Sequence, residues 1–224
     1  MNKRELLAVI EEIGIIPAVR VSSTADALFA SETLFESGIP VVEITMTTPG
    51  ATEIIGQLCR SNPRAVIGAG TVLDVDTARA CLDGGARFLT STGLDPDLVH
   101  FAGESEILMF PGALTPSEVM TAQRAGASFI KIYPCASLGG PSYIRALRGP
   151  FPEVRLIASG GVTQQTGIEY IRAGADVLGI GHDLLPHEAI VARNSGWIHE
   201  LARRFLEIVR HGRDGKPKNG ASQR

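Results

Sequence analysis

The sequence lacks long apolar runs, blocks of like charge and paired cysteines. No stretch reaches the roughly 18 apolar residues of a membrane-spanning helix, and residues 1–14 mix charged and apolar side chains instead of forming the apolar segment of a signal peptide. The net charge of −3 gives no reason to expect nucleic acid or a membrane as a partner. Three cysteines in no metal-type spacing predict a reducing, cytoplasmic location. These absences favour a small-molecule function.

Metal-binding and nucleotide-binding motifs are also missing. The five histidines are scattered and form no ligand-type cluster, so no metal site is predicted. Neither the G-x-S-x-G motif of a nucleophilic serine nor a P-loop is present. We therefore expect chemistry that needs neither a metal nor an organic cofactor.

A repeated pattern of glycine, usually a small residue, and a short apolar strand organises the chain. The four repeats begin at Gly38, Gly85, Gly126 and Gly174. Four further apolar runs lie between them, at residues 15–20, 65–69, 107–110 and 154–158. Amphipathic stretches separate all eight runs, and this alternation predicts a parallel sheet. Eight such units in about 200 residues predict an α/β fold, a single (β/α)8 TIM barrel with an extra N-terminal helix.

The barrel is expected to form one domain over residues 1–211, ending in a helix at 187–211. The polar residues 212–224 are rich in glycine and lysine, and this composition predicts a disordered C-terminal tail.

Lysine is scarce, and one lysine has an unusual position. The chain has four lysines against 17 arginines, and Lys131 is the only one that is not near a terminus. It ends the sixth predicted strand between apolar neighbours, at the end of the barrel where active sites lie. A desolvated lysine can attack a carbonyl group as a neutral amine. The alternative is a lysine with a buried stem and a solvated ammonium group.

Glu43 ends the second predicted strand and is equivalent to Lys131 in the repeat. Equivalent positions on alternate strands share one layer of the barrel interior, so both side chains are expected to face one cavity. Imine chemistry needs a general acid/base, which a carboxyl group there would supply. A plain ion pair that stabilises the barrel mouth is the alternative.

Other strand ends offer groups for an anionic substrate. Arg20 could clamp a carboxylate through two hydrogen bonds or form an internal salt bridge with Glu43. Thr71, after a glycine-rich strand end, could bind a carboxylate or merely belong to a tight turn. Barrels often bind phosphate in the loops after the seventh and eighth strands, through backbone N–H groups. Those loops contain Ser159, Gly160, Gly161, Gly181 and His182.

Several motifs occur in a family-like order between residues 15 and 185: Pro17-Ala-Val-Arg20, Val42-Glu-Ile-Thr45, Ile67-Gly-Ala-Gly-Thr71, Pro111-Gly112, Ile130-Lys-Ile-Tyr-Pro134, Leu147-Arg-Gly-Pro-Phe151 and Gly160-Gly-Val162. They resemble the KDPG/KHG aldolase family, the 2-keto-3-deoxy-6-phosphogluconate and 4-hydroxy-2-oxoglutarate aldolases. The resemblance implies a homotrimer of barrels, with Lys131 as the Schiff-base residue and Glu43 as general acid/base. It also implies that Arg20 and Thr71 hold the substrate near its carboxylate and hydroxyls, and that Gly160 and Gly161 bind phosphate.

The chain departs from the family pattern at several of these positions. Thr47 stands where some members have arginine, and Ser91-Thr92 where Ser-Pro is frequent. Ser159 replaces a threonine but keeps the hydroxyl. His182 stands where the phosphate loop commonly has serine, and an imidazole there could contact phosphate or block it. The predicted substrate-binding residues are thus Arg20, Thr47, Thr71, Pro111, Ser159, Gly160, Gly161, Gly181 and His182.

The sequence thus predicts a class I aldolase that cleaves a 2-oxo acid to pyruvate and an aldehyde. The substrate is expected to be a 2-keto-3-deoxy-6-phospho sugar acid or 4-hydroxy-2-oxoglutarate, and the aldehyde glyceraldehyde 3-phosphate or glyoxylate. Two alternatives stay open at this point. One is a phosphate-binding barrel isomerase or synthase without covalent chemistry, and the other is a barrel that only binds a sugar acid.

Overall fold

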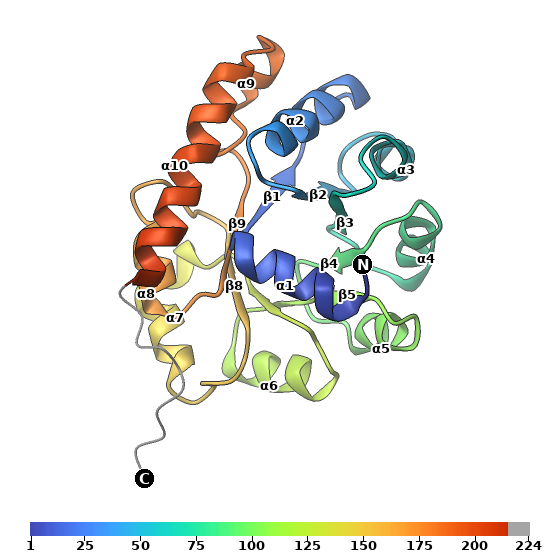
Figure 1. The fold of residues 1–224 in the computed structure, drawn as a ribbon. Helices are drawn as coiled ribbons and strands as arrows, with labels where there is room; N and C mark the ends of the chain where they lie inside the picture. Colours follow the sequence, from blue (N-terminus) through green and yellow to red (C-terminus); the bar gives the residue numbers. More distant parts are fainter. Residues whose placement is uncertain (215–224) are drawn as a thin grey trace.

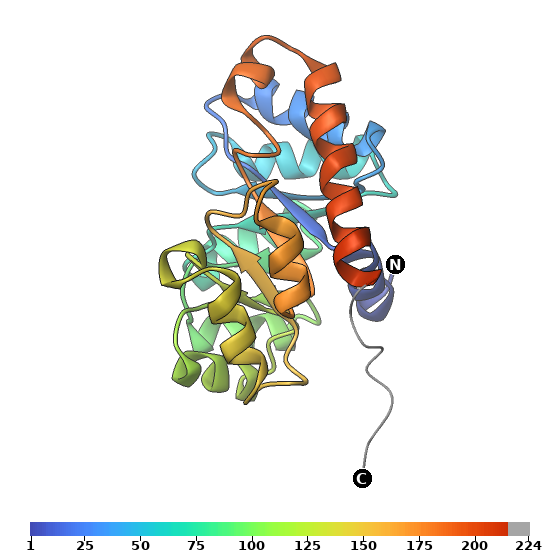
Figure 2. The same cartoon turned by 90° about the vertical axis from the view of Figure 1, so that its left-hand side faces the viewer.

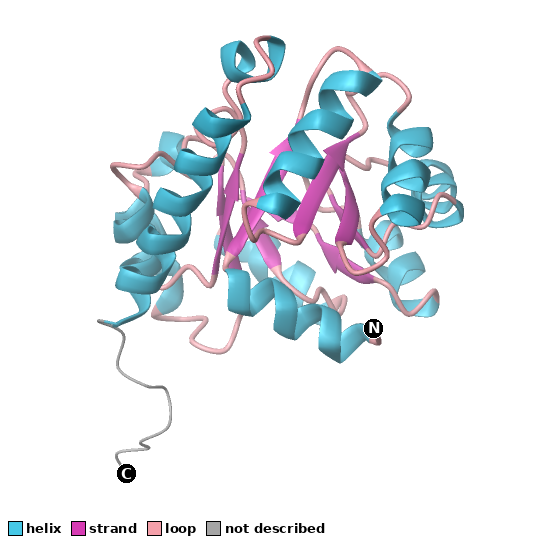
Figure 3. Cartoon of the chain, turned by 45° about the horizontal axis from the view of Figure 1, so that its top comes forward, coloured by secondary structure: helices cyan, strands magenta, loops and turns pink. Residues whose placement is uncertain are grey.

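Parallel strands form the centre of the molecule and helices surround them (Figure 1, Figure 3). The structure is a computed structural model, and it describes residues 1–214. All strand pairs are parallel, in the order β5-β4-β3-β2-β1-β9-β8-β7-β6. The strands are β1 (Ile15–Val19), β2 (Val41–Thr45), β3 (Val66–Gly70), β4 (Phe88–Thr90), β5 (Leu108–Phe110), β6 (Gly112–Ala113), β7 (Ile130–Ile132), β8 (Leu156–Ser159) and β9 (Val177–Ile180).

The two strands at the ends of this order, β5 and β6, are separated in the chain only by Pro111. They are two pieces of one barrel strand, so the chain itself closes the ring. At Gly112 a Cβ atom would lie 2.3 Å from the backbone carbonyl of Thr92, so only glycine fits this close approach. The predicted eight-unit barrel is confirmed, with its fifth strand interrupted.

A helix follows nearly every strand and packs on the outside of the barrel (Figure 1). Several begin at the Ser, Thr or Asp residues that favour helix starts, and the Ser23, Asp74 and Thr115 side chains accept hydrogen bonds from first-turn N–H groups. The helices are α1 (Lys3–Ile13), α2 (Thr24–Glu36), α3 (Ala51–Ser61), α4 (Val75–Asp83), α5 (Pro96–Glu104), α6 (Pro116–Arg124), the 3-10 helix η1 (Ala136–Leu138), α7 (Pro141–Arg148), α8 (Gly167–Ala173), α9 (His187–Val191) and α10 (Ser195–Asp214).

One end of the barrel is filled by apolar side chains and covered by α1. In Figure 3 this helix, beside the N-terminus, lies below the strand ends. Its Leu6 and Ile10 are buried against inward-facing strand residues. Above them Phe88, Phe110 and Phe129 pack together, with ring centroids 5.2 and 5.1 Å apart. Burial of each such side chain contributes roughly 1.5–3 kcal/mol, and it leaves only the carboxyl ends of the strands open to a ligand.

The C-terminal helix differs from its prediction. Instead of one helix at 187–211, α9 and α10 follow each other, and α10 runs along the side of the barrel against α2 and α8 (Figure 2). It continues to Asp214 because Gly212 is buried against α8, where a Cβ would lie 2.7 Å from Ile171. The predicted start of the tail at residue 212 is therefore wrong. The other residues of that predicted tail, 215–224, lie outside the described part.

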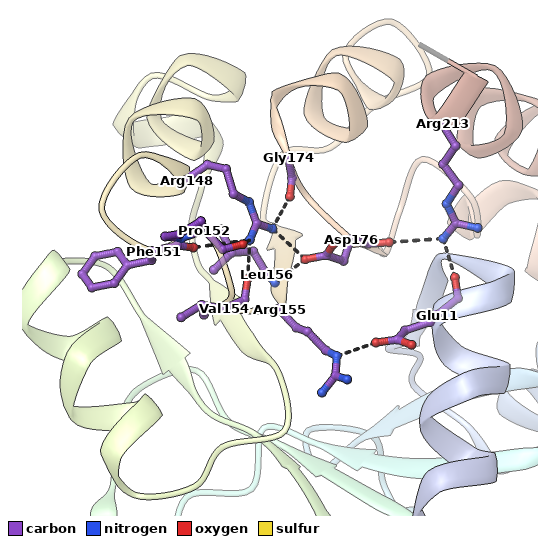
Figure 4. Close-up of polar contacts among 10 residues, drawn as sticks. All are labelled: Glu11, Arg148, Phe151, Pro152, Val154, Arg155, Leu156, Gly174, Asp176 and Arg213. Carbon is purple, nitrogen blue, oxygen red and sulfur yellow. Dashed lines mark hydrogen bonds and ion pairs between the residues drawn. The ribbon is translucent and has the colours of Figure 1, made fainter. Parts of the chain in front are cut away.

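Half-buried arginines connect several elements at the closed end (Figure 4). Arg213 donates from α10 to the backbone carbonyls of Glu11, Glu12 and Asp176. Arg148 forms an ion pair with Asp176 at 2.7 Å. Asp176 also accepts a hydrogen bond from the backbone N–H of Leu156 at 2.8 Å. These contacts link α1, α7, α10, β8 and the segment that enters β9.

Among residues 1–214, no helix is both long and apolar enough to cross a membrane.

Candidate active site

The residues next to the apolar core, towards the open end, form the floor of the site. Side chains alternate along a strand, so the residues two positions after Val41, Phe88 and Phe129 also point into the barrel. These residues are Glu43, Thr90 and Lys131. All three are nearly inaccessible, with exposed fractions of 4%, 1% and 7%. The sequence prediction that Glu43 and Lys131 face one cavity agrees with this geometry.

A short chain of polar contacts joins the three side chains. Thr90 Oγ1 donates a hydrogen bond to Glu43 Oε2 at 2.8 Å, and Lys131 Nζ donates to Thr90 Oγ1 at 3.3 Å. Lys131 Nζ also lies 3.7 Å from Glu43 Oε1, at ion-pair distance. The Tyr133 ring, with its centroid 5.7 Å from Lys131 Nζ, covers the amine from another direction. The amine and the carboxylate are thus held together in a site that excludes most water.

Glycine makes the space that Glu43 occupies. A Cβ atom on Gly70 would lie 2.0 Å from Glu43 Oε1, which is far too close for two non-bonded atoms. On the other side of the barrel, a Cβ on Gly179 would lie 2.8 Å from Ser159 Oγ. Gly179 occupies the fourth equivalent position in the layer of Glu43, Thr90 and Lys131. Its missing side chain therefore leaves room beside the amine.

A cavity of about 440 Å³ opens above this floor. Glu43 and Lys131 lie at its base, and Arg20 lies at its wall after β1. Arg20 is exposed and makes no hydrogen bond or ion pair with any described residue, so the predicted alternative of an internal salt bridge with Glu43 is not observed. The other predicted residues that line the cavity are Ser159, Gly160, Gly161, Gly181 and His182.

The loop after β8 has the shape of an anion or hydroxyl cradle. Gly160 and Gly161 have φ angles of 85° and 82°, in the left-handed region that favours glycine. A Cβ on Gly161 would lie 2.5 Å from Ala136 Cβ. Within residues 1–214, the N–H groups of Gly161 and Val162 meet no acceptor, so they are available to a ligand.

Three predicted substrate-binding residues do not line the cavity. Thr47 is exposed, and its hydroxyl lies 2.9 Å from that of Thr45. Pro111 is buried in the barrel wall, where its carbonyl accepts a hydrogen bond from the Lys131 N–H at 2.9 Å. Thr71 is different, because its buried hydroxyl has no partner among the described residues and its φ of 60° is rare for threonine.

Several residues of the site were not predicted from the sequence. Thr90 occupies the repeat position equivalent to Glu43 and Lys131, and Tyr133 lies two residues after Lys131, so strand periodicity was a usable signal for both. Asp183 and His187 also line the cavity, from the turn after β9 and the start of α9. Nothing in the local sequence singles them out.

Within residues 1–214, no three His, Cys, Asp or Glu side chains gather in a way that could hold a metal ion.

The site and the fold match a known family. Residues 6–201 match the family model described as KDPG and KHG aldolase. The chain belongs to the KDPG/KHG aldolase family. It is accordingly a class I aldolase, a lyase that breaks a carbon–carbon bond, as the sequence predicted.

Relatives of this aldolase cover nearly its whole length. It is 34% identical to the 2-dehydro-3-deoxy-phosphogluconate aldolase of Pseudomonas aeruginosa, over 89% of this chain and 93% of the relative. It is 32% identical to the KHG/KDPG aldolase of Escherichia coli, over 86% and 91%. A crystal structure of the KDPG aldolase of Legionella pneumophila, with pyruvate captured at low pH as a covalent carbinolamine intermediate, superposes with a TM-score of 0.82 at 33% identity, over 88% and 96%.

A more distant structure shows the fold alone. A 3-hexulose-6-phosphate synthase superposes with a TM-score of 0.71 at only 16% identity, over 88% of this chain and 99% of the other. The non-covalent isomerase or synthase considered from the sequence is therefore not favoured, because the closer similarity is to aldolases.

Proposed function

We propose that this aldolase cleaves a 4-hydroxy-2-oxo acid into pyruvate and an aldehyde through an imine on Lys131. The observation that carries the proposal is the buried contact between Lys131 Nζ and Glu43 Oε1, 3.7 Å apart at the base of the cavity. Imine chemistry requires an amine nucleophile and an adjacent group that gives and takes protons. No other lysine lies in the barrel strands.

The reaction begins when the Glu43 carboxylate takes a proton from the Lys131 ammonium group, and the free amine attacks the 2-oxo carbon to give a carbinolamine. The Glu43 carboxyl group gives a proton to the departing hydroxyl, which leaves as water, and the protonated imine forms. The Glu43 carboxylate then takes the proton of the C4 hydroxyl while the C3–C4 bond breaks. The bonding electron pair moves onto the imine nitrogen, which gives an enamine and frees the aldehyde. A proton returns to C3, and water releases pyruvate and the free amine.

The two carboxylate oxygens of Glu43 have different partners. The Thr90 hydroxyl holds Oε2, and Oε1 faces Lys131. A charge-assisted hydrogen bond of this kind fixes the carboxylate orientation. Oε1 is therefore the oxygen that exchanges protons with the substrate in this mechanism.

The carboxylate of the substrate is assigned to Arg20. Arg20 is an unpaired guanidinium at the cavity wall, and its planar geometry matches a carboxylate. The buried hydroxyl of Thr71 has no partner among the described residues, but Thr71 does not line the cavity, so its role in substrate binding stays a prediction. Roles for Thr47 and Pro111 in binding stay predictions.

The relatives suggest two substrates of this class. A 2-keto-3-deoxy-6-phospho sugar acid would yield glyceraldehyde 3-phosphate, and 4-hydroxy-2-oxoglutarate would yield glyoxylate. The names of the Pseudomonas and Escherichia relatives support both. With the sugar acid, the enzyme would serve the Entner–Doudoroff breakdown of carbohydrate.

Borohydride reduction in the presence of pyruvate tests the proposal. We expect a reduced pyruvate adduct on the peptide that contains Lys131, identified by mass mapping. Lys3→Arg is the matched control, because it removes an exposed lysine far from the cavity and should leave the adduct unchanged. A folded wild-type protein that forms no adduct, or forms it only at Lys3, would contradict the imine mechanism.

The homotrimer implied by the resemblance is also a proposal, as is a cytoplasmic location. Leu73, Val191 and Trp197 are large apolar side chains left exposed on the single chain, and burial in an interface would stabilise them. Three free cysteines fit a reducing compartment. We expect light scattering to give three times the 23.7 kDa chain mass. A monomer at micromolar concentration would contradict the trimer.

A further inference from the structure

The aromatic ring of Tyr133 is a part of the site that the proposed proton transfers leave unused. Lys131 Nζ lies over the face of this ring, 5.7 Å from its centroid. Tyr133 is half-buried and lines the cavity. The face of an aromatic ring has a negative electrostatic potential, so it attracts a cation placed over it. The nitrogen of Lys131 therefore has two neighbours that stabilise positive charge, the Glu43 carboxylate and this ring.

The backbone around Tyr133 holds the ring in this place. The Tyr133 N–H donates to the carbonyl of Ala113 at 3.3 Å. The Cys135 N–H donates to the carbonyl of Ser159 at 2.8 Å. A Cβ atom on Gly160 would lie 3.0 Å from Tyr133 Cδ2, so this glycine lets the ring pack closely against the loop after β8. The Tyr133 hydroxyl makes no hydrogen bond with any residue in 1–214, so packing holds the ring.

The charge next to the imine nitrogen changes during the proposed reaction. The imine must be protonated when the C3–C4 bond breaks, because it receives the bonding electron pair. In the same step Glu43 takes the proton of the C4 hydroxyl, so its carboxylate loses the negative charge that faced the imine. The face of the ring takes no proton and keeps its electrostatic potential throughout the cycle. The ring can therefore stabilise the cation while the carboxylate is being neutralised.

We propose that the Tyr133 ring keeps the imine on Lys131 protonated through a cation–π interaction, and so favours cleavage of the carbon–carbon bond. The inference rests on the proposed function, because it needs the imine, and it adds a residue to the mechanism. Cation–π pairs extend to about 6 Å from the ring centroid, and the observed 5.7 Å is near this limit. The expected effect is accordingly a shift of about half a pH unit, or a factor of about three in the protonation equilibrium of the imine.

Other charged and titratable groups face the same cavity and stay in place when Tyr133 is replaced. They come from several elements and are Glu43 of β2, Arg20 after β1, His182 and Asp183 after β9, and His187 of α9. These groups influence how the wild-type rate depends on pH. They are the same in every Tyr133 variant, so a difference between the variants and the wild type reports the tyrosine itself.

The test measures kcat for cleavage as a function of pH. At high pH the rate should fall where the imine loses its proton. Loss of the ring destabilises the protonated imine, so we expect Tyr133→Leu to move this descending limb to lower pH by about half a unit. Tyr133→Phe keeps the ring and should keep the limb near its wild-type position. Tyr143→Leu is the matched control, since it removes a half-buried tyrosine ring of α7 that does not line the cavity, and it should not move the limb.

Fluorinated phenylalanines in place of Tyr133 separate the attraction for a cation from simple packing. Each fluorine withdraws electron density from the face of the ring and changes its volume little, so the attraction weakens with every fluorine added. We expect the descending limb to move to lower pH in steps from phenylalanine to trifluorophenylalanine and pentafluorophenylalanine. This series keeps a ring at the site and decides the question even if Tyr133→Leu does not fold.

Borohydride trapping with pyruvate distinguishes failure of this inference from failure of the proposed function. If the wild type forms the Lys131 adduct and the limb stays in place across the fluorinated series, the inference is overturned and the imine mechanism is left intact. A shift in Tyr133→Phe as large as in Tyr133→Leu would also overturn it, because the hydroxyl would then be responsible. An equal shift in Tyr143→Leu would overturn it as well. A folded wild type without any adduct would overturn the proposed function and this inference with it.

Discussion

Replacement of Lys131 by arginine is expected to lower kcat for aldol cleavage by a factor on the order of 10⁵ or more, as loss of a covalent nucleophile does elsewhere. Arginine keeps a positive charge beside Glu43 but stays protonated at every relevant pH, so it cannot attack a carbonyl carbon. The substitution thus separates the amine from the charge. Pyruvate release, followed with lactate dehydrogenase, measures the loss.

Lys131→Ala serves as the comparison for charge and folding. It removes the cation and leaves Glu43 buried without its partner, which can cost about 3–5 kcal/mol. We therefore expect Lys131→Ala to lower the thermal midpoint more than Lys131→Arg, while both variants are inactive. Turnover by Lys131→Arg near the wild-type rate would favour chemistry that does not use an imine.

Glu43→Gln is expected to lower kcat by about 10²–10⁴, the usual contribution of a general acid/base. Glutamine has nearly the same shape, and its amide oxygen can still accept the hydrogen bond from Thr90 that Glu43 Oε2 accepts. It cannot exchange a proton at physiological pH. Exchange of the pyruvate methyl protons in D2O, followed by NMR, should slow by a similar factor, because enamine formation removes a proton at the same carbon.

Thr90→Val gives a control for orientation. Valine fills the same volume but removes the hydrogen bond that holds Glu43 Oε2. We expect a loss of only about tenfold, in line with one hydrogen bond to a charged group. Exchange of the methyl protons at the wild-type rate in Glu43→Gln would show that another group is the base. If Thr90→Val lowered kcat as much as Glu43→Gln does, the proton transfer would depend on Thr90 and Glu43 together.

The barrel could be predicted because its signals are periodic. The glycine-plus-strand repeat marks alternate strands, and a period of two residues places Glu43 and Lys131 in one layer. The interruption at Pro111 was not predictable, since Gly112 is required by the backbone of Thr92, twenty residues earlier. The extent of α10 was missed for a similar reason, because the contact of Gly212 with Ile171 is invisible in the local sequence.

The break between α9 and α10 left a signal that was overlooked. Asn194 accepts a hydrogen bond from the Trp197 N–H at 3.0 Å and so caps the start of α10. The amphipathic pattern continues on both sides of this cap, which hides the break. In the site, Asp183 lies in a turn whose sequence is ordinary. That it lines the cavity depends on the positions of distant segments, which the local sequence does not reveal.

The two ends of the barrel hold different properties of the molecule. Leu6 and Ile10 of α1, the phenylalanine cluster and the contacts of Arg213 lie at the closed end, and the reactive amine lies beyond them, towards the open end. The side chains that stabilise the fold and the side chains that bind the substrate therefore form separate sets. In laboratory evolution, substitutions at the closed end could raise thermal stability while substitutions around the cavity change substrate specificity, with little effect of one property on the other.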